Sequence, residues 1–563
     1  MPQKIERRKR VLLSVFSFLF ASGLMADAPA TLRPVGMGLG GFAYWEGSPF
    51  ANTMLTAADW LQFGSGEWGQ TIPYEGNAQF DANGYPQYLN PGKKLRTLMW
   101  PFHANYDAAL PSSFPARVGS GVGKWVLTWK GEADLRLGMG GATYLAAESS
   151  GAATGMLVDG RRVYRFGPED APGHLVVEAV NSANPITGIK VWLPDPADPE
   201  QQSLEGQFWH PTFLANLADM PLNHLRFMDW SSTNQSPQRD WADRRPPTHR
   251  HQHGVLNRRS PAAGLTWYVD GNGQAVTFPG DRSTGIAWEH VVALANQTGL
   301  DPWICVPHLA TDTYVRKLAN LFRYGSDGTE PYTSPQANPV YPPLDPGLQV
   351  WVEYSNEIWS NGNSFPQGNW AQAQADAAGI SKPVFNARRY AQVWQIFQEV
   401  FGGSSRLVRT AGVWTGSSSY TDAFLAELHS YGPTLTPAVD ADVIAPTTYF
   451  GNGIQDWAYQ EAVRRRGGSD PWFLTPQDFT RNGSPVPESV PNGDPYWAGP
   501  RIHEHFDATF REWKTRIFSG ATFAGGGPDA AEIGGGFDAG LKDSIFNVFG
   551  QHLPIVSYEG GPR

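Results

Sequence analysis

The feature that most constrains the fold is a series of short apolar runs, each ending in polar or aromatic residues and several followed by a stretch with helical periodicity. We expect strands at residues 34–45, 223–230, 301–308, 348–357, 406–414, 442–449 and 553–559, and helices at 288–298, 386–400 and 505–519. Strands that alternate with helices are typical of a parallel α/β sheet. The sequence therefore predicts an α/β fold with a parallel sheet.

A TIM-type (β/α)8 barrel is the preferred form of that sheet, and a doubly wound open sheet is the alternative. The barrel needs eight strands, but only seven runs are found and the chain stops at Arg563, shortly after the seventh. We interpret the eighth strand as missing from this chain, because a barrel left open would expose unpaired strand edges.

The pattern changes between the first two predicted strands. Alternating apolar and polar runs separated by Gly, Asp and Pro indicate antiparallel strands without long helices. We expect the first barrel strand and helix at residues 34–62, an inserted β-sandwich at 63–200, and the rest of the barrel at 201–563. Asp159 and Gly160 predict a hairpin turn, because this pair tolerates a positive φ.

The first 28 residues have the parts of a secretory signal peptide. A basic run at residues 7–10 precedes an apolar stretch at 11–25, and an A-x-A site ends at Ala28. The stretch is short for a transmembrane helix, so a membrane-anchored form is the lesser alternative. We expect a secreted protein, extracellular or periplasmic, without stable membrane insertion.

Composition excludes some functions. The formal net charge of −10 argues against nucleic-acid binding, which needs a basic surface. Cys305 is the single cysteine, so no intrachain disulfide forms, and its apolar surroundings predict a buried thiol. The chain also has 22 Trp, more than a core alone is expected to hold. Composition says nothing of the oligomeric state.

Two glutamates follow apolar strands late in the chain. Residues 350–357 place Asn356 and Glu357 at a strand end, and residues 553–559 do the same for Glu559. The C-terminal ends of all barrel strands face one site, so these carboxyls can meet although 202 residues (559 − 357) separate them. Two such carboxyls are the requirement of a retaining glycosidase. Asn356 would bind the sugar 2-hydroxyl, and we expect Glu353 to be structural.

These two segments resemble the fourth- and seventh-strand signatures of clan A glycoside hydrolases, which are (β/α)8 barrels. The chain also resembles secreted bacterial proteins described as cellulase-like or cellulose-binding. The resemblance implies that Glu357 is the acid/base and Glu559 the nucleophile. By looser analogy it implies that Arg226, His308 and Tyr449 position or ionise the nucleophile.

Four tryptophans fall at predicted strand ends, where an indole could stack on a sugar ring. They are Trp45, Trp230, Trp359 and Trp414. Core packing explains each one nearly as well, but together they favour a carbohydrate site.

Other motifs carry less weight. Gly36, Gly38 and Gly41 match G-x-G-x-x-G, but no helix is predicted after them, so a dinucleotide site is not expected. His249 and the alternate histidines after it lack the helical spacing of a zinc site. We therefore expect no metal and no cofactor.

The sequence thus predicts a secreted retaining glycoside hydrolase that cleaves β-glycosidic bonds of a polysaccharide or oligosaccharide. A non-catalytic carbohydrate-binding protein on a degenerate barrel is the alternative, and a surface adhesion module is a third. The sequence does not identify the sugar, the linkage, or endo versus exo action.

Overall fold

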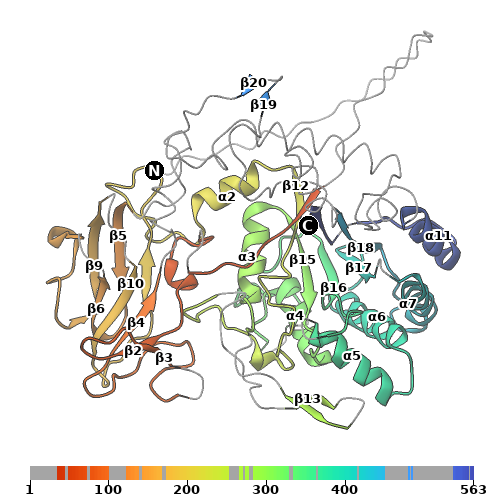
Figure 1. Cartoon of the computed structure of the whole chain (residues 1–563), viewed down its shortest axis with the longest axis horizontal. Coiled ribbons are helices and arrows are strands. Elements are labelled where there is room, and N and C mark those ends of the chain that lie inside the picture. Colours follow the sequence, from red (N-terminus) through yellow and green to blue (C-terminus); the bar gives the residue numbers. More distant parts are fainter. Residues whose placement is uncertain are drawn as a thin grey trace.

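A computed structural model describes the chain over residues 35–44, 48–72, 77–99, 122–138, 142–167, 173–252, 266–269, 273–277, 283–328, 332, 334–362, 365–414, 417–450, 480–481, 484–485, 537–556 and 558–562. These residues form a parallel sheet with helices and, beside it, two larger antiparallel sheets (Figure 1); β13 (Thr266–Val269) with β14 (Ala275–Thr277), and β19 (Thr480–Arg481) with β20 (Ser484–Pro485), form two further two-stranded sheets. The predicted signal peptide and the predicted helix at 505–519 lie outside the described residues. No helix within the described part of the chain is long and apolar enough to span a membrane.

The parallel sheet contains seven strands. They are β1 (Val35–Gly38), β12 (Leu222–Arg226), β15 (Asp301–Val306), β16 (Val350–Tyr354), β17 (Leu407–Val413), β18 (Val443–Phe450) and β21 (Glu559–Pro562). Their spatial order equals their chain order, and every neighbouring pair is parallel. A doubly wound sheet reverses its order at a switch point, so that alternative is wrong.

The sheet remains open in the described residues, where β1 and β21 are its two edges. The seven predicted strands are confirmed, whereas a closed eight-stranded barrel is not seen in this part of the chain. The seventh differs in detail: β21 begins at Glu559, and the preceding segment already runs along β18 through an Ile444–Ile555 bridge.

Helices cover one face of this sheet. They are α2 (Pro211–Ala218), α3 (Trp288–Thr298), α4 (Asp312–Tyr324), α5 (Pro366–Ala377), α6 (Lys382–Phe401), α7 (Ser418–Tyr431) and α11 (Phe537–Phe549). Their ends follow ordinary capping chemistry: the Thr311 side chain accepts from the Tyr314 amide at the start of α4, and Gly325 ends it with φ 72°. The predicted helix at 288–298 is confirmed as α3.

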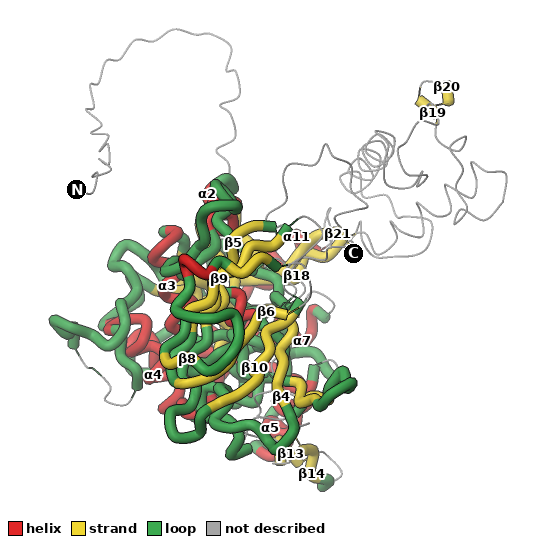
Figure 2. The backbone as a smooth tube through the Cα atoms, turned by 90° about the vertical axis from the view of Figure 1, so that its left-hand side faces the viewer, coloured by secondary structure: helices red, strands yellow, loops and turns green. Residues whose placement is uncertain are grey.

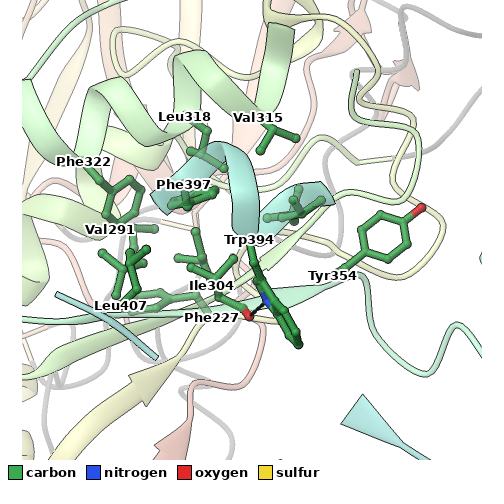
Figure 3. Packing of buried hydrophobic residues seen from close by; sticks show 14 of the residues in the cluster. Phe227, Val291, Ile304, Val315, Leu318, Phe322, Tyr354, Trp394, Phe397 and Leu407 are labelled. Carbon is green, nitrogen blue, oxygen red and sulfur yellow. Dashed lines mark hydrogen bonds between the residues drawn. The ribbon is translucent and has the colours of Figure 1, made fainter. Parts of the chain in front are cut away.

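The main core lies between these helices and the sheet. Phe227, Ile304 and Leu407 from the strand side meet Leu318 and Phe397 from the helices (Figure 3). A further bond ties the layers, because the Trp394 indole N–H donates to the Val352 carbonyl at 2.9 Å. Helix α6 is thereby fixed against β16, the strand that leads to the candidate site.

The other face of the sheet has its own small core. Strand alternation sends Trp303 and Cys305 of β15 and Trp351 of β16 to this inner face, where Tyr558 joins them. Cys305 is buried there, as predicted. The inner face also buries charged side chains, and these are described with the site.

Antiparallel strands form the second half of the described structure. One sheet has the order β3-β2-β4-β10-β6-β8 and the other β11-β5-β9-β7. Their bounds are β2 (Leu61–Phe63), β3 (Gln70–Thr71), β4 (Lys94–Leu98), β5 (Gly123–Thr128), β6 (Glu132–Gly138), β7 (Thr143–Tyr144), β8 (Leu157–Val158), β9 (Arg161–Phe166), β10 (His174–Val180) and β11 (Lys190–Trp192). Figure 2 looks onto this half, with β4, β10 and β6 side by side.

The inner faces of the two sheets share one core, which includes Leu95, Trp125, Leu135 and Val177.

Two sequence-based expectations about this half need correction. Residues 53–56 form a 3-10 turn (Thr53–Thr56) and residues 61–63 join the antiparallel sheet, so the described part of 34–62 holds no α-helix. Asp159 does have a positive φ of 46°, but its turn links strands of different sheets and is not a hairpin.

A loop at residues 245–252, most of it buried, joins the two halves. The Arg250 guanidinium lies 4.5 Å from the Trp60 ring and donates to the Ala58 carbonyl at 2.9 Å. His249 and His251 are buried in the same loop. The two histidines thus pack inside the junction, and His253, the third of the alternating set, lies outside the described residues.

Candidate functional site

The candidate site begins where β16 ends. Every residue of this strand is buried, and the backbone then leaves extended geometry: Ser355 has φ 62° and Glu357 has φ 43°. Positive φ values at non-glycine residues cost on the order of 1–3 kcal/mol each and concentrate at functional sites. The turn buries the amide of Asn356 and leaves the Glu357 side chain half-buried.

The chain's last described segment meets this turn. The Tyr558 hydroxyl donates to Glu357 Oε1 at 3.2 Å, although the two residues are 201 positions apart. Glu559 follows directly and starts β21, with Thr447 as its backbone neighbour in β18. The segments of Glu357 and Glu559 therefore lie together, as predicted. The Glu559 side chain, and with it the distance between the two carboxyls, lies outside the described part.

Arg226, the last residue of β12, is the buried charge of the site. Its Nε and Nη2 donate to Glu353 Oε2 at 3.1 and 3.0 Å, and Nη2 also donates to Asn356 Oδ1 at 2.8 Å. The sequence predicts Glu559 as the partner of Arg226. Among the described side chains Arg226 contacts Glu353 and Asn356, and its Nη1 donates to the Tyr558 carbonyl at 3.4 Å. The contact with the Glu559 side chain stays a prediction.

Glu353 is buried and binds several side chains of the inner face of the sheet. Its Oε2 accepts from Arg226, from the Trp303 indole N–H at 2.9 Å and from the Cys305 thiol at 3.3 Å. Burial raises the pKa of Glu353, and the Arg226 guanidinium opposes that rise. Removing one partner of such a buried pair leaves an uncompensated charge. Glu353 therefore fixes Arg226, which in turn holds Asn356.

Two amides that the sequence does not single out complete the support. Asn356 Nδ2 donates to Asn234 Oδ1 at 3.1 Å, and Gln367 Nε2 donates to that same oxygen at 2.8 Å. Gln367 also donates to the Asn356 carbonyl at 3.0 Å. Asn234 follows β12 in a polar loop and Gln367 is near the start of α5, so no local pattern joins them to Asn356. Only the fold brings the three together.

His308 and Tyr449 belong to different parts of the parallel sheet, with β16 and β17 between their strands. His308 lies just past β15, with a buried ring packed edge-on against Trp370 at 5.4 Å between centroids. Burial lowers the pKa of His308 to about 3, so the ring is neutral at ordinary pH. Tyr449 lies in β18 opposite Gly561, and its side chain is outside the described part. The predicted contacts of both with the nucleophile stay predictions.

The four tryptophans have different outcomes. Trp359 and Trp414 stack face to face, with centroids 5.2 Å apart and planes at 4°, and both are half-buried. Trp230 is only 2% exposed and packs among Phe42, Phe50 and other aromatic residues of the main core. That burial leaves no indole face for a sugar, so the prediction for Trp230 is wrong. Trp45 lies outside the described residues.

Metal ions have no evident site here. Within the described part of the chain, no group of three or more His, Cys, Asp or Glu side chains could hold one. The chemistry that the arrangement can perform is proton exchange by a half-exposed carboxylate, next to an amide donor and a tyrosine hydroxyl.

Comparison with known proteins gives little. No family model matches the chain, and no curated protein matches it. Among solved structures, an arabinose-bound GH51 α-L-arabinofuranosidase aligns at a TM-score of 0.30 and 12% identity, over 79% of this chain and 66% of that one, which is just under two thirds of its length. The CBM22-1–GH10 modules of a Clostridium thermocellum endo-1,4-β-D-xylanase 10B, complexed with xylohexaose, align at a TM-score of 0.24 and 8% identity, over 71% of this chain and 74% of that one. Scores this low carry no inference about the chain, and its chemistry has to be argued from its own residues.

Proposed function

We propose that this chain is a secreted retaining glycoside hydrolase that cleaves β-glycosidic bonds of a polysaccharide. Glu357 is the acid/base and Glu559 the nucleophile. The observation that carries the proposal is the 3.2 Å hydrogen bond from Tyr558 to Glu357, because it brings the backbone of Glu559 to the turn that presents Glu357.

The mechanism follows from two carboxyls on either side of one glycosidic bond. Glu559 attacks the anomeric carbon while Glu357 gives its proton to the leaving oxygen, and a covalent glycosyl–enzyme forms. Glu357 then takes a proton from water, which releases the sugar with its original configuration. Asn356 donates from Nδ2 to the 2-hydroxyl, a contact that strengthens as the transition state forms.

The stacked pair of Trp359 and Trp414 supports a carbohydrate as the ligand. Trp359 lies two residues after Glu357, and Trp414 directly follows β17. We expect a sugar bound on this pair to reach the Glu357 carboxyl. Secretion is part of the proposal because of the basic and apolar start of the chain. Cleavage after Ala28, measured by mass spectrometry of the exported protein, tests it.

The two glutamates are tested by substitution. Glu357→Gln should lower turnover of β-glycans by about 10²–10⁴-fold, but less on aryl glycosides whose leaving group needs no proton. Glu559→Gln should abolish turnover of both substrates. Glu399→Gln serves as the control, because this glutamate pairs with Arg316 on the outside of the molecule. Unchanged turnover in either glutamate variant contradicts the proposal.

A non-catalytic carbohydrate-binding protein is the second candidate, and the same tryptophan stack favours it. A stack can bind sugar without any carboxyl. Binding of insoluble glycan that survives both Glu→Gln substitutions, with no reducing sugar released by the parent protein, would decide for this candidate.

A further inference from the structure

The amides around Asn356 have orientations that their partners fix. A guanidinium can only donate, so the atom of Asn356 facing Arg226 is oxygen and its nitrogen faces Asn234. At the other end, Gln367 Oε1 accepts from the backbone N–H of Gln235 at 3.3 Å, and its nitrogen donates to the Asn356 carbonyl. Each end of the chain of amides is thus anchored on a group of fixed polarity.

Asn234 lies between these two donors. Asn356 Nδ2 and Gln367 Nε2 both point at one atom of its side chain, so that atom is the oxygen. The Asn234 nitrogen must therefore point away from both. The side chain is half-buried, and its nitrogen has no hydrogen-bond partner within the described part of the chain. A held amide whose donor group is left over beside Asn356 is suited to a ligand.

Backbone strain supports the same location. Five non-glycine residues in the described part have positive φ, and four of them flank this contact: Ser232 at 50° and Gln235 at 62° beside Asn234, and Ser355 and Glu357 beside Asn356. The fifth, Asp159, is in the antiparallel half. Strain of this kind persists only where the surrounding structure enforces it, so the two loops are held in this arrangement at an energetic cost.

We propose that Asn234 is a second hydroxyl-binding amide of the site and that Gln367 is its positioning residue. The amide donors of Asn234 and Asn356 together then select sugar units with two neighbouring free hydroxyls. The inference rests on the proposed function for the location of the sugar. It adds a residue that recognises the sugar, from the loop after β12. The proposed roles of Glu357 and Glu559 do not depend on this residue. A sugar that lacks either hydroxyl leaves one amide donor without an acceptor, and this loss gives discrimination.

The test compares Asn234→Asp with Asn296→Asp. The first keeps the oxygen that Asn356 and Gln367 need and replaces only the NH₂, which has no partner among the described residues. The second makes the same change at an amide of α3 that donates to the Pro343 carbonyl and accepts from the Asp345 amide, away from the site. Asn234→Ser replaces Asn234→Asp if the latter unfolds at a temperature well below the parent protein.

Two measurements are made. Binding of cellohexaose and xylohexaose to the Glu357→Gln protein is followed by calorimetry, and turnover of aryl β-glucoside is compared with its 2-deoxy and 3-deoxy analogues. Asn234→Asp should weaken hexaose binding and lower kcat/KM by about 10- to 100-fold. On the deoxy analogue that lacks the hydroxyl bound by Asn234, Asn234→Asp should lower kcat/KM little further, because the lost contact is already absent. Gln367→Glu should reduce the same discrimination, while Gln367→Asn retains part of it.

The outcomes separate the two proposals. If both Glu→Gln variants lose turnover but Asn234→Asp behaves like Asn296→Asp, the role of Asn234 is wrong and the proposed function stands. An equal loss on the parent sugar and both deoxy analogues also overturns it, because a structural defect does not distinguish hydroxyls. If the Glu→Gln variants keep turnover and Asn234→Asp still weakens hexaose binding, the glycosidase proposal fails and the amide site stands. No binding or turnover with any of these sugars overturns both.

Discussion

The parallel and antiparallel halves each bury an arginine against a carboxylate, and they satisfy it in different ways. Arg162 of β9 pairs with Asp134 at 2.6 Å and otherwise donates to backbone carbonyls of Leu135, Ala152 and Gly155. Arg226 of β12 instead donates mainly to side chains.

The difference concerns what each arginine holds in place. Bonds to carbonyls tie strands and loops together, so Arg162 stabilises the antiparallel half as a structure. Bonds to Glu353 and Asn356 instead fix side chains at and before the turn that presents Glu357. Both side chains are buried, with 0% of Arg162 and 3% of Arg226 exposed, but their burial has different roles. We infer that the inner face of the parallel sheet accepts buried charge because it supports the proposed site.

The largest expected effect tests this contrast by removing each arginine. Arg162→Met and Arg226→Met should each lower the free energy of unfolding by about 3–5 kcal/mol. The first leaves the half-buried Asp134 and three carbonyls without their donor, and the second leaves the buried Glu353 without its charged partner. Only Arg226→Met should also lower glycan turnover, by roughly 10²-fold, since Asn356 and its neighbours lose their alignment. Denaturant unfolding and turnover are measured at a temperature where both variants are folded.

Arg226→Lys sharpens the result. Lysine keeps the charge but lacks the planar fork that reaches Glu353, Asn356 and the Tyr558 carbonyl together. Stability should recover in part while turnover stays low. A loss of turnover in folded Arg162→Met equal to that in Arg226→Met would remove the distinction between the two halves.

The same contrast explains what sequence reasoning could find. The strand ends that bear Asn356 and Glu357 are predictable, because an apolar run followed by polar residues marks the edge of a parallel sheet. Which face a buried residue occupies is not, since both faces of such a strand are apolar. For this reason the pattern alone predicts no partner for Glu353. Trp230 is a different case, because it lies in the turn after β12, and that turn folds its ring into the main core. Asn234 and Gln367 are 133 positions apart and meet only through packing.

A medium-sized effect on stability is expected when the pH is lowered. Burial lowers the pKa of His308 to about 3 and of His224 and His290 to about 4, all in the parallel half. The unfolded chain binds these protons near pH 6.5 and the folded chain does not, so stability is lost as the pH falls below that value. His308 alone contributes roughly 3 kcal/mol of this loss by about pH 4.

The measurement is amide hydrogen exchange as the pH is lowered. Exchange in β15 and β16 should accelerate before exchange in β9 and β10, where the half-buried His174 is the titrating histidine. His290→Gln, in α3 and away from the site, should flatten the pH dependence of stability, whereas His174→Gln should change it less. Simultaneous loss of protection in both halves of the His290→Gln protein would contradict the assignment.

The smallest effect compares two strained residues, one in each half. Ser355→Gly should raise the free energy of unfolding by about 1 kcal/mol, because glycine relieves the φ of 62° at a smaller entropic cost. Asp159→Gly should give no gain, although its φ of 46° is also positive, because the Asp159 carboxylate accepts from the Gly131 amide at 3.0 Å and pairs with Lys130. Turnover separates the two further: Ser355→Gly loosens the turn that presents Asn356 and Glu357 and should lower kcat severalfold, while Asp159→Gly should leave it unchanged. A Ser355→Gly protein that is more stable and equally active would mean that strain at the end of β16 plays no part in holding the site.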